Sequence, residues 1–198
     1  MKSLRVYFSD KDLLHLQSLK VGIAGTGGLG SNIAVMLARS GLCQFCLLDR
    51  DRLEAANLNR QHFFPEHIDR PKVTCLKEQL VTINPDISCR EYYLEWSPGQ
   101  PNDPFPQCDI LFEAFDGAET KARFIDYYSG MVPCLISGNG MCGLNPLEPL
   151  PVRRVADVFV VGDGVTDVSP EQPPLAPRVT ACAAKMAEIG LAWALGKI

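Results

Sequence analysis

A run of glycines stands near the start of the chain, directly after a short apolar segment. Residues 21–30 read VGIAGTGGLG, so Gly25, Gly27 and Gly30 follow the apolar residues at the spacing G-x-G-x-x-G. Between a strand and a helix, this spacing permits a tight turn, close approach of the backbone to phosphate and close helix–strand packing. The N-terminus of the following helix adds free N–H groups and a favourable dipole. The segment therefore predicts a site for nucleotide phosphates.

An acid at the end of the next apolar segment fits the same kind of site. Asp49 closes FCLLD, residues 45–49, where a carboxylate can bind the hydroxyl groups of a ribose. A glycine loop followed by a ribose-binding acid occurs in sites for NAD, FAD and ATP alike. These two features predict a nucleotide and leave the chemistry open.

Polar side chains further along the chain favour ATP over a redox dinucleotide. The connector DRDRLEAANLNRQ, residues 49–61, carries Asp51, Asn57 and Arg60, and Lys72 follows shortly after it. Two cations near a triphosphate suit the charge that builds up on a leaving pyrophosphate. Asp116 ends CDILFEAFD, residues 108–116, and a carboxylate at the end of a later strand can hold Mg²⁺ in the same crevice.

Each of these residues alone also has an ordinary structural explanation. Arg60 and Lys72 can belong to a solvated surface, and Asp116 can cap the helix that starts at GAETKARF. Their order behind one glycine loop favours a common site over three unrelated roles.

An alternation of strand and helix patterns runs along the chain and connects these residues. It predicts an α/β, Rossmann-like, doubly wound and mainly parallel sheet with helices on both faces, in a single domain over residues 1–198. The segment 138–163 predicts an antiparallel C-terminal extension, and 164–177 a loop. The final helix, 178–196, is apolar around most of its circumference, so it packs on the core or on another subunit. The expected strands are 21–25, 45–49, 87–94, 108–116 and 133–138, and the expected helices are 10–19, 28–40, 71–84 and 117–130.

Composition excludes several classes of partner. The net charge is −4, which provides no overall attraction for nucleic acid or anionic lipid. No apolar run approaches the length of a membrane helix and the N-terminus lacks a signal-peptide core, so we expect a cytoplasmic protein. Its 8 cysteines are then expected to be free thiols. One C-x-x-C, at 43–46, has no second pair to complete a zinc site, so no structural zinc is expected.

Taken together, these motifs resemble those of the ThiF/MoeB-type adenylyltransferases, which are relatives of ubiquitin-activating enzymes. The matching segments are GTGGLGSNIA, LLDRD followed by NLNRQ, RPKV, Asn84-Pro85 and FEAFDGAETK. The resemblance covers about residues 20–137. Beyond it, VVGD followed by LAPRV and a long helix is similar to the short ThiF-like proteins of thiamine biosynthesis.

This resemblance implies a reaction and a set of residues for it. The enzyme would use ATP and Mg²⁺ to adenylate the C-terminal carboxylate of a ubiquitin-like sulfur-carrier protein, ThiS-like and ending in Gly-Gly, releasing pyrophosphate. The implied catalytic residues are Arg60, Lys72 and Asp116, and Asp116 would bind Mg²⁺. The implied nucleotide-binding residues are Gly25, Gly27, Gly28, Gly30, Asp49, Asp51, Asn57, Arg60 and Lys72.

Several alternatives stay open at this point. The carrier could belong to the molybdopterin pathway, or the chain could be a non-catalytic nucleotide-binding scaffold or a dinucleotide oxidoreductase. A homodimer is expected from the resemblance and from the apolar final helix. Family members usually carry an arginine near the N-terminus that reaches the partner's ATP, but Arg5 lacks the usual surrounding motif and is not assigned this role.

Overall fold

Seven strands form one sheet in the computed structural model, which describes residues 2–198. The strand order is β3-β2-β1-β4-β5-β7-β6. All neighbouring strands are parallel except β6 and β7, which form an antiparallel hairpin at one edge. The strands are β1 Lys20–Ala24, β2 Gln44–Asp49, β3 Ser88–Tyr93, β4 Ile110–Glu113, β5 Cys134–Gly138, β6 Val152–Val155 and β7 Val158–Val161.

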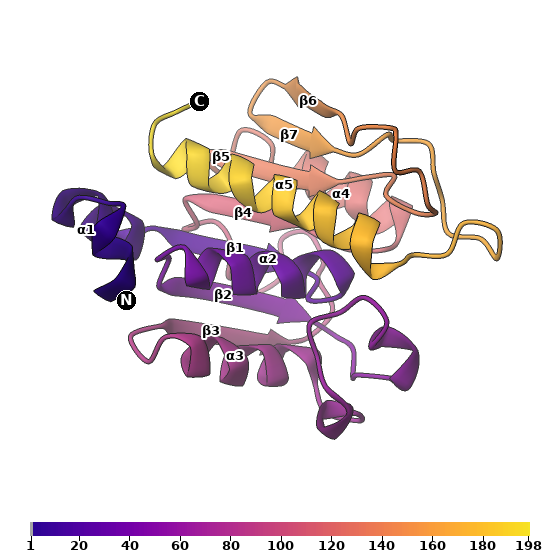
Figure 1. Cartoon of the computed structure of the whole chain (residues 1–198), viewed down its shortest axis with the longest axis horizontal. Helices are drawn as coiled ribbons and strands as arrows, with labels where there is room; N and C mark the ends of the chain where they lie inside the picture. Colours follow the sequence, from indigo (N-terminus) through magenta and orange to yellow (C-terminus); the bar gives the residue numbers. More distant parts are fainter. Residues whose placement is uncertain (1) are drawn as a thin grey trace.

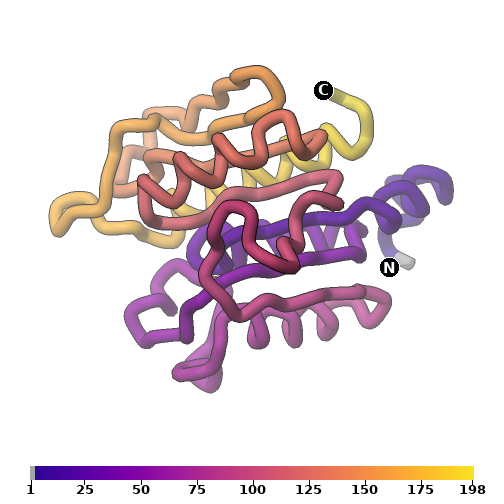
Figure 2. Tube along the Cα trace, turned by 180° about the vertical axis from the view of Figure 1, so that it is seen from behind, coloured from indigo at the N-terminus to yellow at the C-terminus, as the bar shows by residue number. Residues whose placement is uncertain are grey.

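Helices cover both faces of this sheet. In Figure 1, α2, α3 and α5 lie across the near face, and Figure 2 shows α4 on the opposite face. This arrangement confirms the expected Rossmann-like α/β fold with its antiparallel C-terminal end. The helices are α1 Asp10–Ser18, α2 Gly28–Arg39, α3 Lys72–Ile83, α4 Ala118–Tyr128 and α5 Ala176–Ala194, with short 3-10 helices η1 Lys2–Val6, η2 Ala55–Asn57 and η3 Pro65–His67.

The central strands are apolar because both of their faces are covered. All residues of β4 and β5 are buried, as are four of the five residues of β1. Strands enclosed in this way read as continuous apolar runs and not as alternating ones. One core lies under α2, α3 and α5 and includes Ile33 and Met186, and the other, under α4, includes Phe124.

The last helix is part of the first of these cores. Residue Gly190 of α5 lies so close to the sheet that a Cβ atom there would be 2.7 Å from Phe112 Cζ. Val179, Cys182 and Met186 are buried on the same helix. Of the two expected partners for this helix, the core and another subunit, the structure shows the core of the same chain. Within residues 2–198, no helix is both long enough and apolar enough to cross a membrane.

Strand β4 is shorter than the apolar pattern suggests. The pattern predicts a strand over 108–116, but β4 ends at Glu113. The chain turns here because the Glu113 side chain folds back and its Oε1 accepts a hydrogen bond from the Phe115 N–H at 2.8 Å. Residues 114–117 therefore form a loop between β4 and α4, and Asp116 lies in that loop.

Candidate nucleotide-binding site

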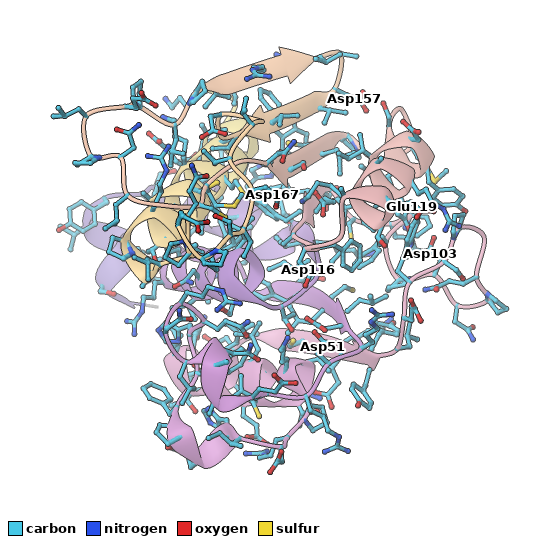
Figure 3. All side chains as sticks on the ribbon, turned by 90° about the vertical axis from the view of Figure 1, so that its right-hand side faces the viewer. Asp51, Asp103, Asp116, Glu119, Asp157 and Asp167 are labelled. Carbon is cyan, nitrogen blue, oxygen red and sulfur yellow. The ribbon has the colours of Figure 1, made fainter. Side chains whose placement is uncertain are left out.

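The strand order reverses between β1 and β4, and a pocket of about 340 Å³ lies beyond the carboxyl ends of these strands. In open α/β sheets, ligands bind at this kind of switch point. Gly25, Gly27 and Gly28 line the pocket from the β1 side, and Asp116 lines it from the β4 side. Figure 3 views this end of the sheet, with Asp51, Asp116 and Asp167 one above another along it.

The glycines of the loop have two different tasks. Gly25 has a φ of +87° and lies against the next loop, since a Cβ there would be 2.6 Å from Ala114 O. A Cβ on Gly30 would be 1.9 Å from Gly25 O, so Gly30 allows the first turn of α2 to pack on the loop. Gly30 does not line the pocket. Gly27 and Gly28 do, at the N-terminus of α2, where first-turn N–H groups have no partner within the helix.

Asp49 holds the glycine loop and lines the pocket at the same time. It is 7% exposed, and its Oδ2 accepts hydrogen bonds from Thr26 N at 2.6 Å and Thr26 Oγ1 at 3.0 Å. Its Oδ1 accepts one from Asp51 N at 2.9 Å. Carboxylate oxygens have further lone pairs, so these bonds leave room for ribose hydroxyl groups.

Lys72 and Arg60 approach the pocket with different partners. Lys72 is 6% exposed, at the start of α3, and its Nζ lies 2.8 Å from Asp51 Oδ2. Arg60 donates to Asn59 Oδ1 at 2.7 Å and to Ala56 O at 3.2 Å, and it forms no ion pair with any residue that the structure describes. Both cations line the pocket, so the structure brings them together as the sequence predicts.

Asn57 lies away from the pocket lining. Its Oδ1 accepts a hydrogen bond from Glu54 N at 3.1 Å, which closes the single turn of η2. In this position the side chain shapes the connector that carries Arg60. Direct contact of Asn57 with a nucleotide stays a prediction.

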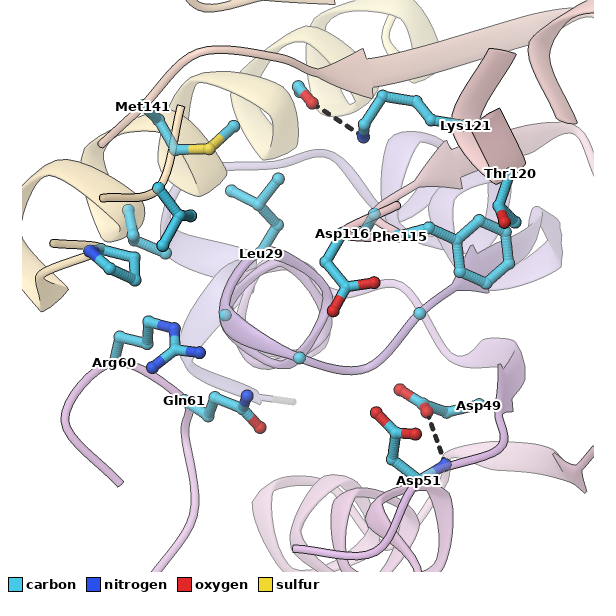
Figure 4. A pocket seen from close by; sticks show the side chains of 18 of the residues that line it. Leu29, Asp49, Asp51, Arg60, Gln61, Phe115, Asp116, Thr120, Lys121 and Met141 are labelled. Atoms are coloured by element: carbon cyan, nitrogen blue, oxygen red, sulfur yellow. Dashed lines mark hydrogen bonds between the residues drawn. The ribbon is translucent and has the colours of Figure 1, made fainter. Parts of the chain in front are cut away.

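Asp116 is exposed in the loop after β4 and does not cap the following helix. The N-cap of α4 is Gly117, and the Asp116 carboxylate makes no hydrogen bond or ion pair with a residue in the described range. Figure 4 shows it pointing into the pocket between Lys121 on one side and Asp49 and Asp51 on the other. An unengaged carboxylate in this place can serve as an oxygen ligand for a divalent cation.

The structure also contains a buried ion pair behind Asp116, which was not predicted from the sequence. Lys121 of α4 lines the pocket, and its Nζ lies 2.7 Å from Oε2 of the fully buried Glu113. One signal in the sequence could have found the pair. Glu113 is the one charged residue in the buried strand ILFE, and a buried carboxylate requires a cationic or hydrogen-bonding partner nearby.

The far wall of the pocket is built by segments after residue 138. Asn139, Met141 and Cys142 line it together with Thr166 and Asp167. Cys142 is 6% exposed, and burial raises the pKa of its thiol, so this thiol is not activated.

Hydrogen bonds and an ion pair of Asp163 connect these segments to one another. Its Oδ1 accepts hydrogen bonds from Val165 N and Thr166 N, each at 2.8 Å, and its Oδ2 lies 3.5 Å from Nη2 of the buried Arg178. Arg178 also donates to Asn145 O at 2.9 Å. One carboxylate and one guanidinium thereby connect the loop after β5, the loop after β7 and the start of α5.

Apolar side chains form another part of the lining. Leu48, Leu94, Trp96 and Phe115 surround the end of β2 and the loop after β4. Trp96 donates from Nε1 to the Tyr128 hydroxyl at 3.2 Å, which fixes the indole ring. Apolar side chains that line the same pocket as Asp49 suit a nucleobase attached to the ribose.

A glycine loop at the switch point of a Rossmann-like sheet, facing two cations and a free carboxylate, defines a nucleotide-binding α/β protein. The sequence matches the ThiF family over residues 2–138, and the chain belongs to this family. This confirms the resemblance that the motifs indicated.

Curated relatives match only part of the chain. Ubiquitin-like modifier-activating enzyme 5 of Dictyostelium discoideum is 42% identical over 73 residues, which are 37% of this chain and 19% of that protein. The enzyme of the same name from Gallus gallus is 40% identical over 77 residues, 39% of this chain and 19% of that protein. The chain thus spans about a fifth of the length of these relatives.

Solved structures share the fold over nearly the whole chain. E. coli tRNA N6-threonylcarbamoyladenosine dehydratase, TcdA, in complex with AMP has a TM-score of 0.83 at 18% identity, over 99% of this chain and 93% of that one. E. coli MccB with ATP has a TM-score of 0.69 at 22% identity, over 92% of this chain and 58% of that one. At these identities, the likeness shows the fold alone.

Proposed function

We propose that this protein is an ATP-dependent adenylyltransferase that activates a C-terminal carboxylate. The observation that carries the proposal is one pocket in which Arg60, Lys72 and Asp116 face the glycine loop. Two cations and a free carboxylate around the phosphates suit a reaction that expels pyrophosphate better than they suit a dinucleotide oxidoreductase or a scaffold that only binds nucleotide. TcdA and MccB, which share the fold, have been solved with ATP.

In this reaction the chain positions charges and moves no proton. The first-turn N–H groups at Gly27 and Gly28 bind phosphate oxygens, and Asp49 accepts hydrogen bonds from the ribose. Arg60 and Lys72 stabilise the negative charge that grows on the departing pyrophosphate. The attacking group is already a carboxylate, so no general base is required.

Asp116 is the residue that would hold Mg²⁺. Magnesium keeps several waters and is commonly bound by one or two carboxylates together with substrate phosphates. A single exposed carboxylate without another partner among the described residues fits that requirement. The ion would supply additional positive charge beside the phosphates when it is bound.

We further propose that the substrate is a ThiS-like sulfur-carrier protein ending in Gly-Gly, in thiamine biosynthesis. The support is the resemblance of the C-terminal segments to short ThiF-like proteins. A carrier of the molybdopterin pathway is the alternative. Relatives named ubiquitin-like modifier-activating enzymes, and MccB solved with MccA, are in keeping with a protein or peptide carboxylate as substrate. A net charge of −4 speaks against tRNA.

Pyrophosphate release tests the proposed substrate. Each purified carrier is incubated with the protein, ATP and Mg²⁺, and a matched carrier lacking its last two glycines is the control. We expect release with the ThiS-like carrier and none with either truncated carrier. ATP binding without release for any carrier would favour the scaffold, and release with the molybdopterin-pathway carrier alone would replace the proposed substrate.

We also propose a homodimer, on the family resemblance. The apolar surface of α5 no longer supports it, because that helix is packed against this chain's own sheet. Figure 1 shows α1 at the amino ends of the strands, whereas the pocket lies beyond their carboxyl ends. Light scattering at micromolar concentration is expected to give twice the mass of the chain, and a monomer with full activity would contradict this.

A further inference from the structure

A fully buried carboxylate lies between the ends of β4 and β5. Glu113 is 0% exposed, and three donors satisfy it: Lys121 Nζ at 2.7 Å and Ser137 Oγ at 2.6 Å on Oε2, and Phe115 N at 2.8 Å on Oε1. A buried carboxylate that is paired and hydrogen-bonded in this way holds its partner in a fixed place.

Hydrogen bonds fix the position of Lys121, the partner of Glu113, without using all of its N–H donors. The side chain is 13% exposed, and Nζ donates to Glu113 Oε2 and to Gly138 O at 2.9 Å. An ammonium group has three N–H donors. The third has no acceptor among the residues that the structure describes, and Lys121 lines the pocket. Figure 4 shows the bond from Lys121 to a backbone carbonyl.

Lys121 differs in location from the other cations of the site. Of the described residues that line the pocket, Arg50, Arg60, Lys72 and Lys121 are cationic. Arg50 pairs with Glu95, Lys72 pairs with Asp51, and both lie on the β2 side. In Figure 4, Arg60 and Lys121 lie on opposite sides of Asp116. Lys121 alone among the four belongs to the wall made by β4, β5 and α4.

The geometry points to Lys121 as the cation that receives the attacking carboxylate of the substrate, with Glu113 and Ser137 as its positioning residues. This inference rests on the proposed adenylation. A carboxylate oxygen forms a bond to the α-phosphorus, and the bond from that phosphorus to the bridging oxygen breaks. The electron pair leaves with pyrophosphate, and no proton is transferred. Two anions must meet in this step, so a cation on the side away from Arg60 and Lys72 lowers their repulsion.

Lys121 cannot simply be removed alone. Lys121→Met would leave Glu113 buried without its counter-charge, which is strongly destabilising in itself. The informative variant is therefore the double change Glu113→Gln/Lys121→Met, which keeps the site neutral. The matched control is Glu188→Gln/Lys185→Met, which removes an exposed pair with an N–O distance of 2.8 Å on α5.

The probe is a stable mimic of an acyl-adenylate, N-acetyl-glycylglycyl-sulfamoyladenosine, compared with AMP by calorimetry. We expect the wild-type protein to bind the mimic more tightly than AMP. In the double variant, affinity for the mimic should fall by about 10- to 100-fold, the scale of one lost charged hydrogen bond, while AMP affinity changes less than about twofold. The control should bind both ligands as the wild type does.

The outcomes separate this inference from the proposed function. If the folded double variant keeps its affinity for the mimic, Lys121 only stabilises the fold and the inference is wrong. An equal loss for AMP and mimic would also overturn it, because a general disturbance of the pocket would then be the cause. If the wild type binds neither ligand, the proposed function itself fails.

Discussion

At the scale of single residues, the two cations that the sequence predicts for the site, Lys72 and Arg60, differ in how much the fold depends on them. Lys72 is buried and paired with Asp51, so its removal would affect both folding and chemistry. Arg60 makes two hydrogen bonds to neighbouring connector residues and no ion pair with a described residue. Arg60 is therefore the better residue for a test of catalysis alone.

We predict that Arg60→Ala lowers the adenylation rate by at least about 10²-fold, the effect of losing one preorganised charge near the reacting phosphates. The melting temperature should hardly change, since partly exposed polar contacts contribute only about 0–1 kcal/mol. Carrier-dependent pyrophosphate release and thermal unfolding measure the two effects. Arg123→Ala, at an exposed position of α4, is the control. A lower melting temperature with full activity per folded molecule would make Arg60 structural.

Asp116 allows a second prediction at the same scale. Asp116→Asn removes the negative charge but keeps the size, so turnover should fall by about 10²-fold or more, while ATP binding falls less. The Mg²⁺ concentration needed for half-maximal rate should rise. Magnesium titrations of the rate measure this, with Asp126→Asn on the exposed face of α4 as the control. An unchanged magnesium dependence would exclude Asp116 as the ligand.

At the scale of elements, the far wall of the pocket depends on Asp163. Partial burial alone would raise the pKa of this carboxyl, but N–H groups of Thr166 and Val165 and the charge of Arg178 hold it below its ordinary value. A carboxyl whose pKa is lower in the folded state adds stability above the pKa of the unfolded state. That stability is lost as the pH falls through the folded-state pKa.

We therefore predict that Asp163→Asn lowers the free energy of unfolding by about 1 kcal/mol at pH 7, the scale of a hydrogen bond to a charged group after partial solvent screening. The difference should begin to shrink below about pH 4, where the unfolded chain starts to bind the proton, and should disappear as the pH falls through the lower pKa of the folded state. Urea unfolding at a series of pH values measures it, beside the exposed Asp126→Asn. A difference that stays constant down to pH 3 would show that the ionised carboxylate is not what holds this wall.

Among the elements, the parallel sheet could be predicted from the sequence, but the end of β4 and the Glu113–Lys121 pair could not. The alternation of apolar strands and helices was sufficient for the parallel sheet, because local apolar runs and their spacing determine it. The position of Asp116 in one pocket with Arg60 and Lys72 also follows, since carboxyl ends of parallel strands meet at one edge. The end of β4 and the Glu113–Lys121 pair do not follow, because they depend on a side chain turning back onto Phe115 N and reaching another element.

At the scale of the whole molecule, the pocket combines pieces from both halves of the chain. The glycine loop, Asp49, Arg60 and Lys72 come from the first 72 residues, and the wall opposite comes from segments after residue 113. The match to the ThiF family ends at residue 138, before the segments that hold Asp163 and Arg178. The residues that we propose to bind phosphate therefore lie in the family region, and we expect the later segments to determine which carrier is accepted.

Intact mass spectrometry of the carrier tests the proposal that the pocket joins AMP to the C-terminal carboxylate of a carrier protein. The carrier is incubated with the protein, ATP and Mg²⁺ and measured before and after treatment with hydroxylamine. We predict that the carrier gains the mass of one adenylyl group at its last residue and loses it to hydroxylamine, and that Arg60→Ala and Asp116→Asn form little of it. Cleavage of ATP to ADP and phosphate, or an adenylyl group on a side chain of the carrier, would contradict this proposal.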